Sequence, residues 1–171
     1  MQEWHFSLEL HAQTLRNFDP LPLLLHILVE SPELAVHKGV LYTILAELYS
    51  NALDHGVLGL DSSMKADAKG FATYYSQREM LLNDLMQGYI RFNIKHVTTS
   101  TGGKLILRIE DSGSGFDYQQ YLNNNFKKEG YSGRGILLVR DLCEEFHYLG
   151  AGNCVEAIYS WQYPDVREQK T

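Results

Sequence analysis

A carboxylate and a carboxamide lie one helical turn apart in the segment ELYSNALDHG, which covers residues 47–56. Glu47 and Asn51 are four residues apart and project from the same side of a helix, and Asp54 falls on that side too. A carboxylate can orient or deprotonate an attacking group, and a carboxamide oxygen is a neutral ligand for a hard cation such as Mg²⁺. The alternative is an ordinary solvated helix face, because polar residues normally flank the apolar stripe of an amphipathic helix.

A second candidate directly follows an apolar segment: residues 111–116 read DSGSGF. The carboxylate of Asp111, at a strand end, can accept a hydrogen bond from an amino group such as the exocyclic amine of adenine. Gly113 and Gly115 lack side chains, which would let the backbone pass close to a flat ring. A plain glycine-rich turn explains the same residues equally well.

A third candidate opens a predicted helix at residues 132–136, which read SGRGI. Backbone amides at a helix start bind anions, and glycines such as Gly133 and Gly135 allow a phosphate to approach them. In the alternative, Ser132 is simply the N-cap of that helix. Each candidate alone is a weak signal. The three in this order, with the 16-residue segment 116–131 between the last two, form a strong one.

Hydrophobic periodicity predicts the elements that position these residues. Alternation with period two indicates strands at residues 4–10, 89–96, 104–110 and 155–161. Helical spacing indicates helices at residues 21–30, 34–56, 71–87 and 136–146, and loops remain at 57–70 and 111–133. This order predicts one α+β domain over residues 1–171, a two-layer sandwich with helices on one face of a mixed, mostly antiparallel sheet.

Composition excludes several classes of protein. The 171 residues include 15 Lys and Arg against 21 Asp and Glu, a net charge of −6, so we do not expect general nucleic-acid binding. The N-terminus lacks a signal-peptide pattern, the apolar runs are too short to span a membrane, and the two cysteines form no CxxC pair. We therefore expect a soluble, cytoplasmic protein. It has no P-loop, because neither GxxxxGKS nor GxxxxGKT occurs.

Together, the three candidates resemble the N, G1 and G2 boxes of the GHKL ATPase superfamily, which includes gyrase B, MutL and the histidine kinases. The spellings ELYSNALDHG and GRGILLVR look closer to the bacterial anti-sigma-factor serine kinases than to the histidine kinases. The resemblance covers residues 1–162 and implies the Bergerat ATP-binding fold, with ATP and Mg²⁺ as ligands. Residues 57–88 then look like an insertion, similar to that of kinase modules fused to response-regulator phosphatases.

The resemblance also implies a role for each matching residue. Glu47 would be the catalytic residue, Asn51 would ligate Mg²⁺, and Asp111 would bind the adenine amine. Residues 116–132 would form a lid over ATP. The other predicted cofactor-binding residues are Asp54, Gly113, Gly115, Lys128, Ser132, Gly133, Arg134 and Gly135.

Two positions depart from the pattern of that superfamily. Tyr131 stands where the compact kinases often carry a basic residue, which puts a contact to the γ-phosphate in doubt unless Arg134 or Lys128 replaces it. Asn153 stands where the superfamily tends to place a Thr that assists adenine recognition. We expect Asn153 either to substitute for that Thr or to leave the contact missing.

The resemblance implies an ATP-dependent serine kinase that phosphorylates a STAS-type anti-sigma-factor antagonist in bacterial partner switching. A sigma factor, fused receiver and phosphatase domains and a second copy of the chain are further expected partners. The alternative function is a non-catalytic ATP-binding module that regulates a sigma factor or a fused phosphatase. Retention of both Glu47 and Asn51 favours the enzyme, because a pure adenine sensor would need neither.

Overall fold

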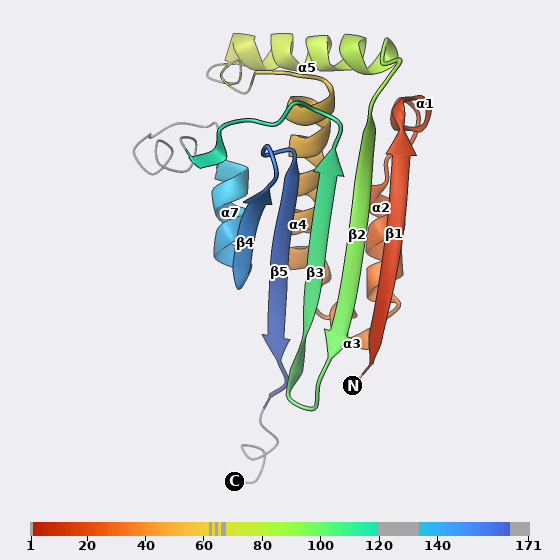
Figure 1. The fold of residues 1–171 in the computed structure, drawn as a ribbon, viewed down its shortest axis with the longest axis vertical. Helices are drawn as coiled ribbons and strands as arrows, with labels where there is room; N and C mark the ends of the chain where they lie inside the picture. Colours follow the sequence, from red (N-terminus) through yellow and green to blue (C-terminus); the bar gives the residue numbers. More distant parts are fainter. Residues whose placement is uncertain (1, 62, 64, 66–67, 120–133, 165–171) are drawn as a thin grey trace.

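Five strands form an antiparallel sheet in the computed structural model, which describes residues 2–61, 63, 65, 68–119 and 134–164 (Figure 1). The strands are β1 (Glu3–His11), β2 (Tyr89–Thr98), β3 (Gly102–Asp111), β4 (Glu145–Leu149) and β5 (Cys154–Gln162). They lie in the order β1-β2-β3-β5-β4, and all four pairings are antiparallel. The predicted α+β sandwich is confirmed, with antiparallel pairing throughout where we expected a mixed sheet.

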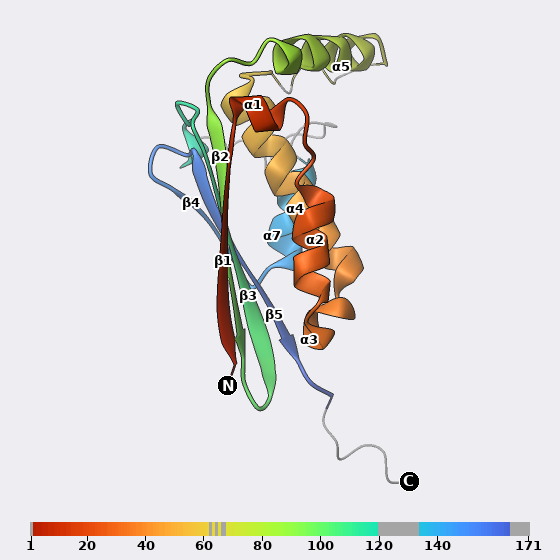
Figure 2. The same ribbon diagram turned by 90° about the vertical axis from the view of Figure 1, so that its right-hand side faces the viewer.

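Helices cover one face of this sheet, which gives the molecule its two layers (Figure 2). In chain order, the helices of the described residues are α1 (Ala12–Leu15), α2 (Leu21–Val29), α3 (Pro32–Ala35), α4 (Lys38–Asn51), the π-helix η1 (Ala52–Val57), α5 (Ala68–Asn83) and α7 (Arg134–Leu142). Among the described residues, no helix is long and apolar enough to cross a membrane. The core between the layers includes the fully buried Leu41, Ile44 and Leu45 of α4.

The register of β2 and β3 places Asp111 at the edge of this core. Phe92 pairs with Ile109 and Ile94 pairs with Leu107, and all four side chains are buried. A slip of one residue would turn them to the opposite face, so burial specifies the register strongly. Asp111 pairs with Ile90 and ends β3. The alternation read from the sequence therefore determines where this carboxylate lies.

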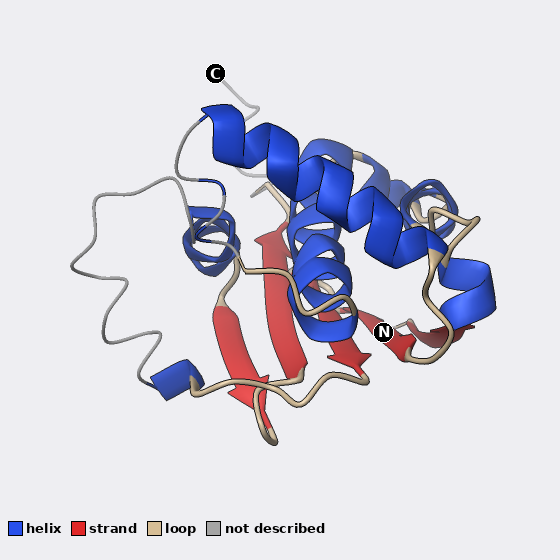
Figure 3. Ribbon diagram, turned by 90° about the horizontal axis from the view of Figure 1, so that it is seen from above, coloured by secondary structure: helices blue, strands red, loops and turns tan. Residues whose placement is uncertain are grey.

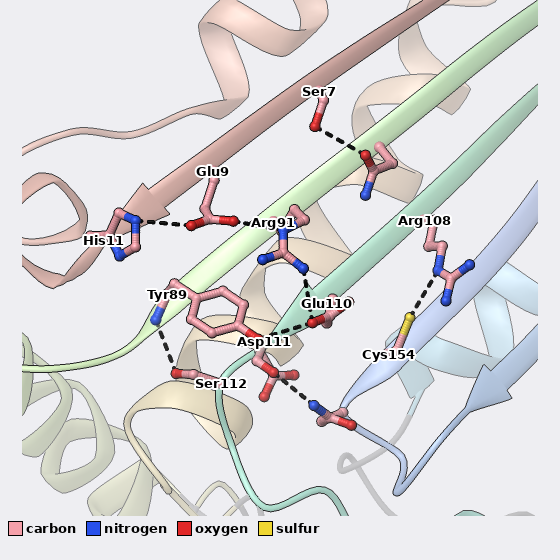
Figure 4. A network of polar contacts seen from close by, with 12 residues as sticks. Ser7, Glu9, His11, Tyr89, Arg91, Arg108, Glu110, Asp111, Ser112 and Cys154 are labelled. Atoms are coloured by element: carbon pink, nitrogen blue, oxygen red, sulfur yellow. Dashed lines mark hydrogen bonds and ion pairs between the residues drawn. The ribbon is translucent and has the colours of Figure 1, made fainter.

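The other face of the sheet is polar, and Figure 4 shows its contacts beside Asp111. Arg91 lies between two carboxylates: its Nε donates to Glu9 at 2.6 Å and its Nη1 to Glu110 at 3.2 Å. The Tyr89 hydroxyl also donates to Glu110, at 2.9 Å. Water screens such exposed pairs, so each adds little to stability. Together they join β1, β2 and β3 at the end of the sheet that carries Asp111.

The helix predicted over residues 34–56 is in fact three elements: α3, α4 and η1. α4 ends at Asn51, and η1 continues it as a wider turn. The amide of Leu58 donates to the carbonyl of Leu53 at 2.8 Å, an i to i+5 bond that is diagnostic of a π-helix. This change of pitch follows Asn51, so the α-helical spacing that placed Asp54 beside Glu47 and Asn51 does not hold there.

α5 lies across the end of the helical layer (Figure 3), and side-chain contacts to Asp54 anchor it to η1. The Tyr74 hydroxyl donates to Asp54 Oδ2 at 2.8 Å, and Arg78 Nε donates to Asp54 Oδ1 at 2.6 Å. The Asp54 side chain is only 4% exposed. A charge this buried needs a partner, so the pair with Arg78 holds α5 against η1.

The prediction of a helix over 136–146 is wrong in its second half. α7 ends at Leu142, and the following strand β4 pairs with β5, with Phe146 opposite Ala157. Gly150 and Gly152 reverse the chain between the strands with φ values of 60° and 93°, which glycine adopts without strain. A five-residue strand gives too little alternation to be told apart from the helical spacing beside it.

We expect Arg78→Met to lower the free energy of unfolding by about 3 kcal/mol, because it leaves the buried Asp54 carboxylate without a cation. Asp54→Asn removes that charge, so the double variant should lose less stability than the two single losses added together. Urea unfolding of the wild type and the three variants measures this coupling. Strictly additive losses would contradict an interaction between the two side chains.

Candidate functional site

A cavity of about 560 Å³ lies where α4, η1, the end of β3, the start of α7 and the start of β5 meet. It brings together described residues of all three sequence candidates. The predicted site residues that line it are Glu47, Asn51, Asp111, Gly115, Arg134 and Gly135. Segments more than 60 residues apart in sequence therefore share one cavity, which the functional interpretation of the motifs requires.

Glu47 and Asn51 line this cavity from successive turns of α4. The Glu47 carboxylate lies directly against the Cα of Gly135, where an added Cβ would overlap Glu47 Oε2. The start of α7 approaches α4 this closely because residue 135 has no side chain. The contact joins the first sequence candidate to the third.

The amide nitrogen Nδ2 of Asn51 is buried and has no hydrogen-bond partner among the described residues. Such an unpaired group costs about 1–3 kcal/mol, so it is rare and calls for an explanation. The two ends of a carboxamide are assigned from their surroundings, and a rotated side chain would present its oxygen instead. Asn51 is therefore suited to bind a polar ligand, including a cation through its oxygen.

Asp111 is a buried carboxylate, 8% exposed, at the end of β3. Its Oδ1 accepts a hydrogen bond from the Gly113 amide at 2.8 Å, and its carboxyl group packs against the Cα of Gly56. Burial raises the pKa of this carboxyl from 3.8 to about 6; the Gly113 bond opposes that rise and the charge of Glu110 adds to it. A carboxylate held at such a cost is typical of functional sites.

Asn153 fixes the backbone of Asp111 from the turn before β5. The Asp111 amide donates to the Asn153 carbonyl at 2.9 Å, and Asn153 Nδ2 donates to the Asp111 carbonyl at 2.9 Å. Asn153 also lines the cavity. Its contribution to adenine recognition in place of Thr stays a prediction, but its support of Asp111 is direct.

The two glycines of the second candidate act differently. A Cβ at Gly113 would overlap the carbonyl oxygen of Gly56, so this glycine allows the strand end to approach η1, and it does not line the cavity. Gly115 lines the cavity and has a φ of 77°, a conformation that other residues rarely adopt. Only Gly115 is thus placed to lie along a ligand.

Asp54 is directed away from the cavity, contrary to our prediction of a cofactor contact. It does not line the cavity and is engaged by Arg78 and Tyr74 of α5. The π-helical turn after Asn51 is the physical reason, because its wider pitch does not keep Asp54 on the helix side of Asn51, three residues earlier. Lys128, Ser132, Gly133, Tyr131 and lid residues 120–132 lie outside the described residues, so their predicted roles stay predictions.

Sequence reasoning missed several residues that line the cavity. They are Ser50, His55, Leu60, Asp61, Lys65, Ser114 and Tyr148. His55 Nδ1 lies 2.6 Å from the carbonyl oxygen of Leu60, a contact that folds the chain after η1 back toward the cavity. The segment after residue 57 shows no periodicity, so its composition indicated a loop and gave no sign that it forms a cavity wall.

These residues fit ATP with Mg²⁺. The cavity volume lies in the usual range of small-molecule sites, about 300–1,000 Å³. Asp111 Oδ2 accepts no hydrogen bond from the described residues and can accept one from the amine of a purine. Asn51 offers a carboxamide to a hard cation, and Arg134 offers positive charge to phosphate.

Asp111→Asn should make the protein more stable at neutral pH. The folded-state pKa of about 6 exceeds the ordinary 3.8, so the protonated carboxyl stabilises the folded state. Its contribution to the free energy of unfolding is full below pH 3.8 and is lost as pH rises to 6. The variant lacks this titration, so its stability relative to wild type should rise by about 2–3 kcal/mol between pH 4 and pH 7.5. Urea unfolding at both pH values measures the difference; an equal difference at both would contradict the raised pKa.

Comparison with known proteins agrees with this geometry. A family model described as the histidine kinase-like ATPase domain matches residues 39–159, well over half of the chain. That match includes Glu47, Asn51, Asp111 and Gly135. A search of curated proteins found no match. With the cavity, the antiparallel sheet and the family match in agreement, the chain belongs to the histidine kinase-like ATPase family.

Proposed function

We propose that this protein is an ATP-dependent serine kinase of the anti-sigma-factor type, which acts in the cytoplasm on a STAS-type antagonist. The observation that carries the proposal is the convergence of Glu47, Asn51 and Asp111 on one cavity. Membership of the histidine kinase-like ATPase family supports ATP as the ligand. The spelling of the motifs supports the narrower class of kinase and its partner.

Asp111 is the residue that selects adenine in this proposal. Its ionised carboxylate accepts a hydrogen bond from the exocyclic amine, and a charged acceptor strengthens that bond. Binding thereby gives Asp111 Oδ2 the partner that it lacks among the described residues. Gly115 allows the backbone to lie close to the base.

Asn51 and Glu47 act at the phosphate end. Asn51 would hold Mg²⁺ through its carboxamide oxygen, and the metal would supply neutralisation of charge on the phosphates. Glu47 accepts the proton of the serine hydroxyl as the Oγ–P bond forms and the bond from Pγ to the ADP oxygen breaks. Arg134 adds positive charge near the start of α7.

The second candidate function is a non-catalytic ATP-binding module that regulates a sigma factor or a fused phosphatase. Tyr131 favours it, because the compact kinases often have a basic residue there. Both functions need the same adenine contact to Asp111. They differ in phosphoryl transfer: the kinase needs Glu47 as a base for this step, and the non-catalytic module does not carry it out.

Glu47→Gln and Asp111→Asn should separate turnover from binding. Glu47→Gln keeps the shape of the side chain but removes the base, so we expect unchanged ATP affinity and a loss of phosphoryl transfer of about 10²–10⁴-fold. Asp111→Asn replaces an acceptor with a donor, so we expect ATP affinity at least about tenfold weaker. Calorimetric titration with ATP and Mg²⁺, and transfer of radiolabelled γ-phosphate to a candidate STAS-domain protein, measure the two effects.

Glu79→Gln is the matched control, because Glu79 is an exposed carboxyl of α5 that does not line the cavity. If wild type binds ATP tightly but transfers no radiolabelled phosphate to any STAS-domain protein tested, the result would favour the non-catalytic module. Unchanged ATP affinity in Asp111→Asn would count against the assignment of the adenine site itself.

A further inference from the structure

Lys65 reaches the cavity from the connection between η1 and α5. It lines the cavity together with Leu60 and Asp61 of the same segment. None of the three sequence candidates includes Lys65, and the sequence indicated only a loop there. A cation contributed to a nucleotide cavity by this segment requires an explanation.

The ammonium group of Lys65 is positioned by an aromatic ring. Its Nζ lies 4.1 Å from the centroid of the Tyr74 ring, a distance at which a cation is attracted to the face of the ring. Tyr74 is fully buried, and its hydroxyl donates to Asp54 at 2.8 Å. The ring is thus fixed between α5 and η1, and it holds the lysine beside the cavity.

The charge of the cavity favours a role for this lysine. Three carboxylates line the cavity, those of Glu47, Asp61 and Asp111. A nucleoside triphosphate adds further negative charge, so its phosphates require cations. Among the described lining residues, Lys65 and Arg134 carry permanent positive charge, and Lys65 forms no ion pair with the described part of the chain.

We propose that Lys65 is a further nucleotide-binding residue and that its ammonium group contacts the phosphate oxygens of ATP. This proposal rests on the proposed function, because it concerns the same cavity. A lysine ammonium is a compact charge on a flexible stem, so Lys65 can follow the phosphates while Tyr74 keeps it nearby. Lys65 then completes the nucleotide site together with Leu60 and Asp61, which line the same cavity.

Affinities for ATP, ADP and adenosine test this contact. We compare wild type with Lys65→Met, which removes the charge, and Lys65→Arg, which keeps it. Lys69→Met is the matched control, since Lys69 is exposed on α5 and does not line the cavity. We expect Lys65→Met to bind ATP and ADP about tenfold more weakly than wild type and to bind adenosine with unchanged affinity. Lys65→Arg and Lys69→Met should stay close to wild type, and raising the salt concentration should weaken ATP binding less in Lys65→Met than in wild type.

Two results would overturn this proposal and leave the proposed function standing. If wild type binds ATP and Lys65→Met binds it equally well, Lys65 makes no phosphate contact, while the proposed function stands. If Lys65→Met lowers the affinities for ATP and adenosine by the same factor, the lysine only supports the cavity wall. A wild type that binds neither ATP nor adenosine would overturn the proposed function as well.

Discussion

The buried carboxylate of Asp111 is the constraint on which the arrangement of the cavity depends. It ends β3, and Gly56 and Gly113 have no side chains where it packs between the sheet and η1. The Gly113 amide holds its side chain and the Asn153 side chain holds its backbone, yet burial still raises the pKa of its carboxyl to about 6. An ionised group at this position lowers the stability of the fold, which is consistent with the proposed role of Asp111 as the acceptor of a bound amine.

The rest of the site is built by close approaches between elements remote in sequence. Gly135 brings the start of α7 against Glu47 of α4, so two segments of the family match that are 88 residues apart in sequence meet at one point. Asp54 is directed away from the cavity and accepts a hydrogen bond from Tyr74 of α5. That contact fixes the Tyr74 ring, over which the ammonium group of Lys65 lies. Leu60, Asp61 and Lys65, which follow η1, are therefore part of the cavity wall.

Those features that depend on local pattern could be predicted from the sequence. Alternation identified β2 and β3, and thereby the strand end that carries Asp111, because burial of one face fixes the register. The spacing of Glu47 and Asn51 was correct because both lie within the regular part of α4. The prediction that Asp54 lies on the same helix side as Asn51 was wrong, because the π-helix begins one residue after Asn51. That change of pitch has no clear signal in the sequence. Lys65 was missed because its place in the cavity depends on a tertiary contact with Tyr74, which no periodicity encodes.

The most direct test of this account is a carbon-13 NMR titration of the Asp111 carboxyl, assigned by comparison with Asp111→Asn, with and without saturating ATP. The account predicts a pKa of about 6 in the free protein, because the group is buried. It predicts a lower pKa with ATP bound, because the adenine amine donates to the ionised form and stabilises it. A pKa near 3.8 in the free protein would contradict the burial of this carboxyl, and a pKa that ATP leaves unchanged would contradict the claim that it is the adenine acceptor.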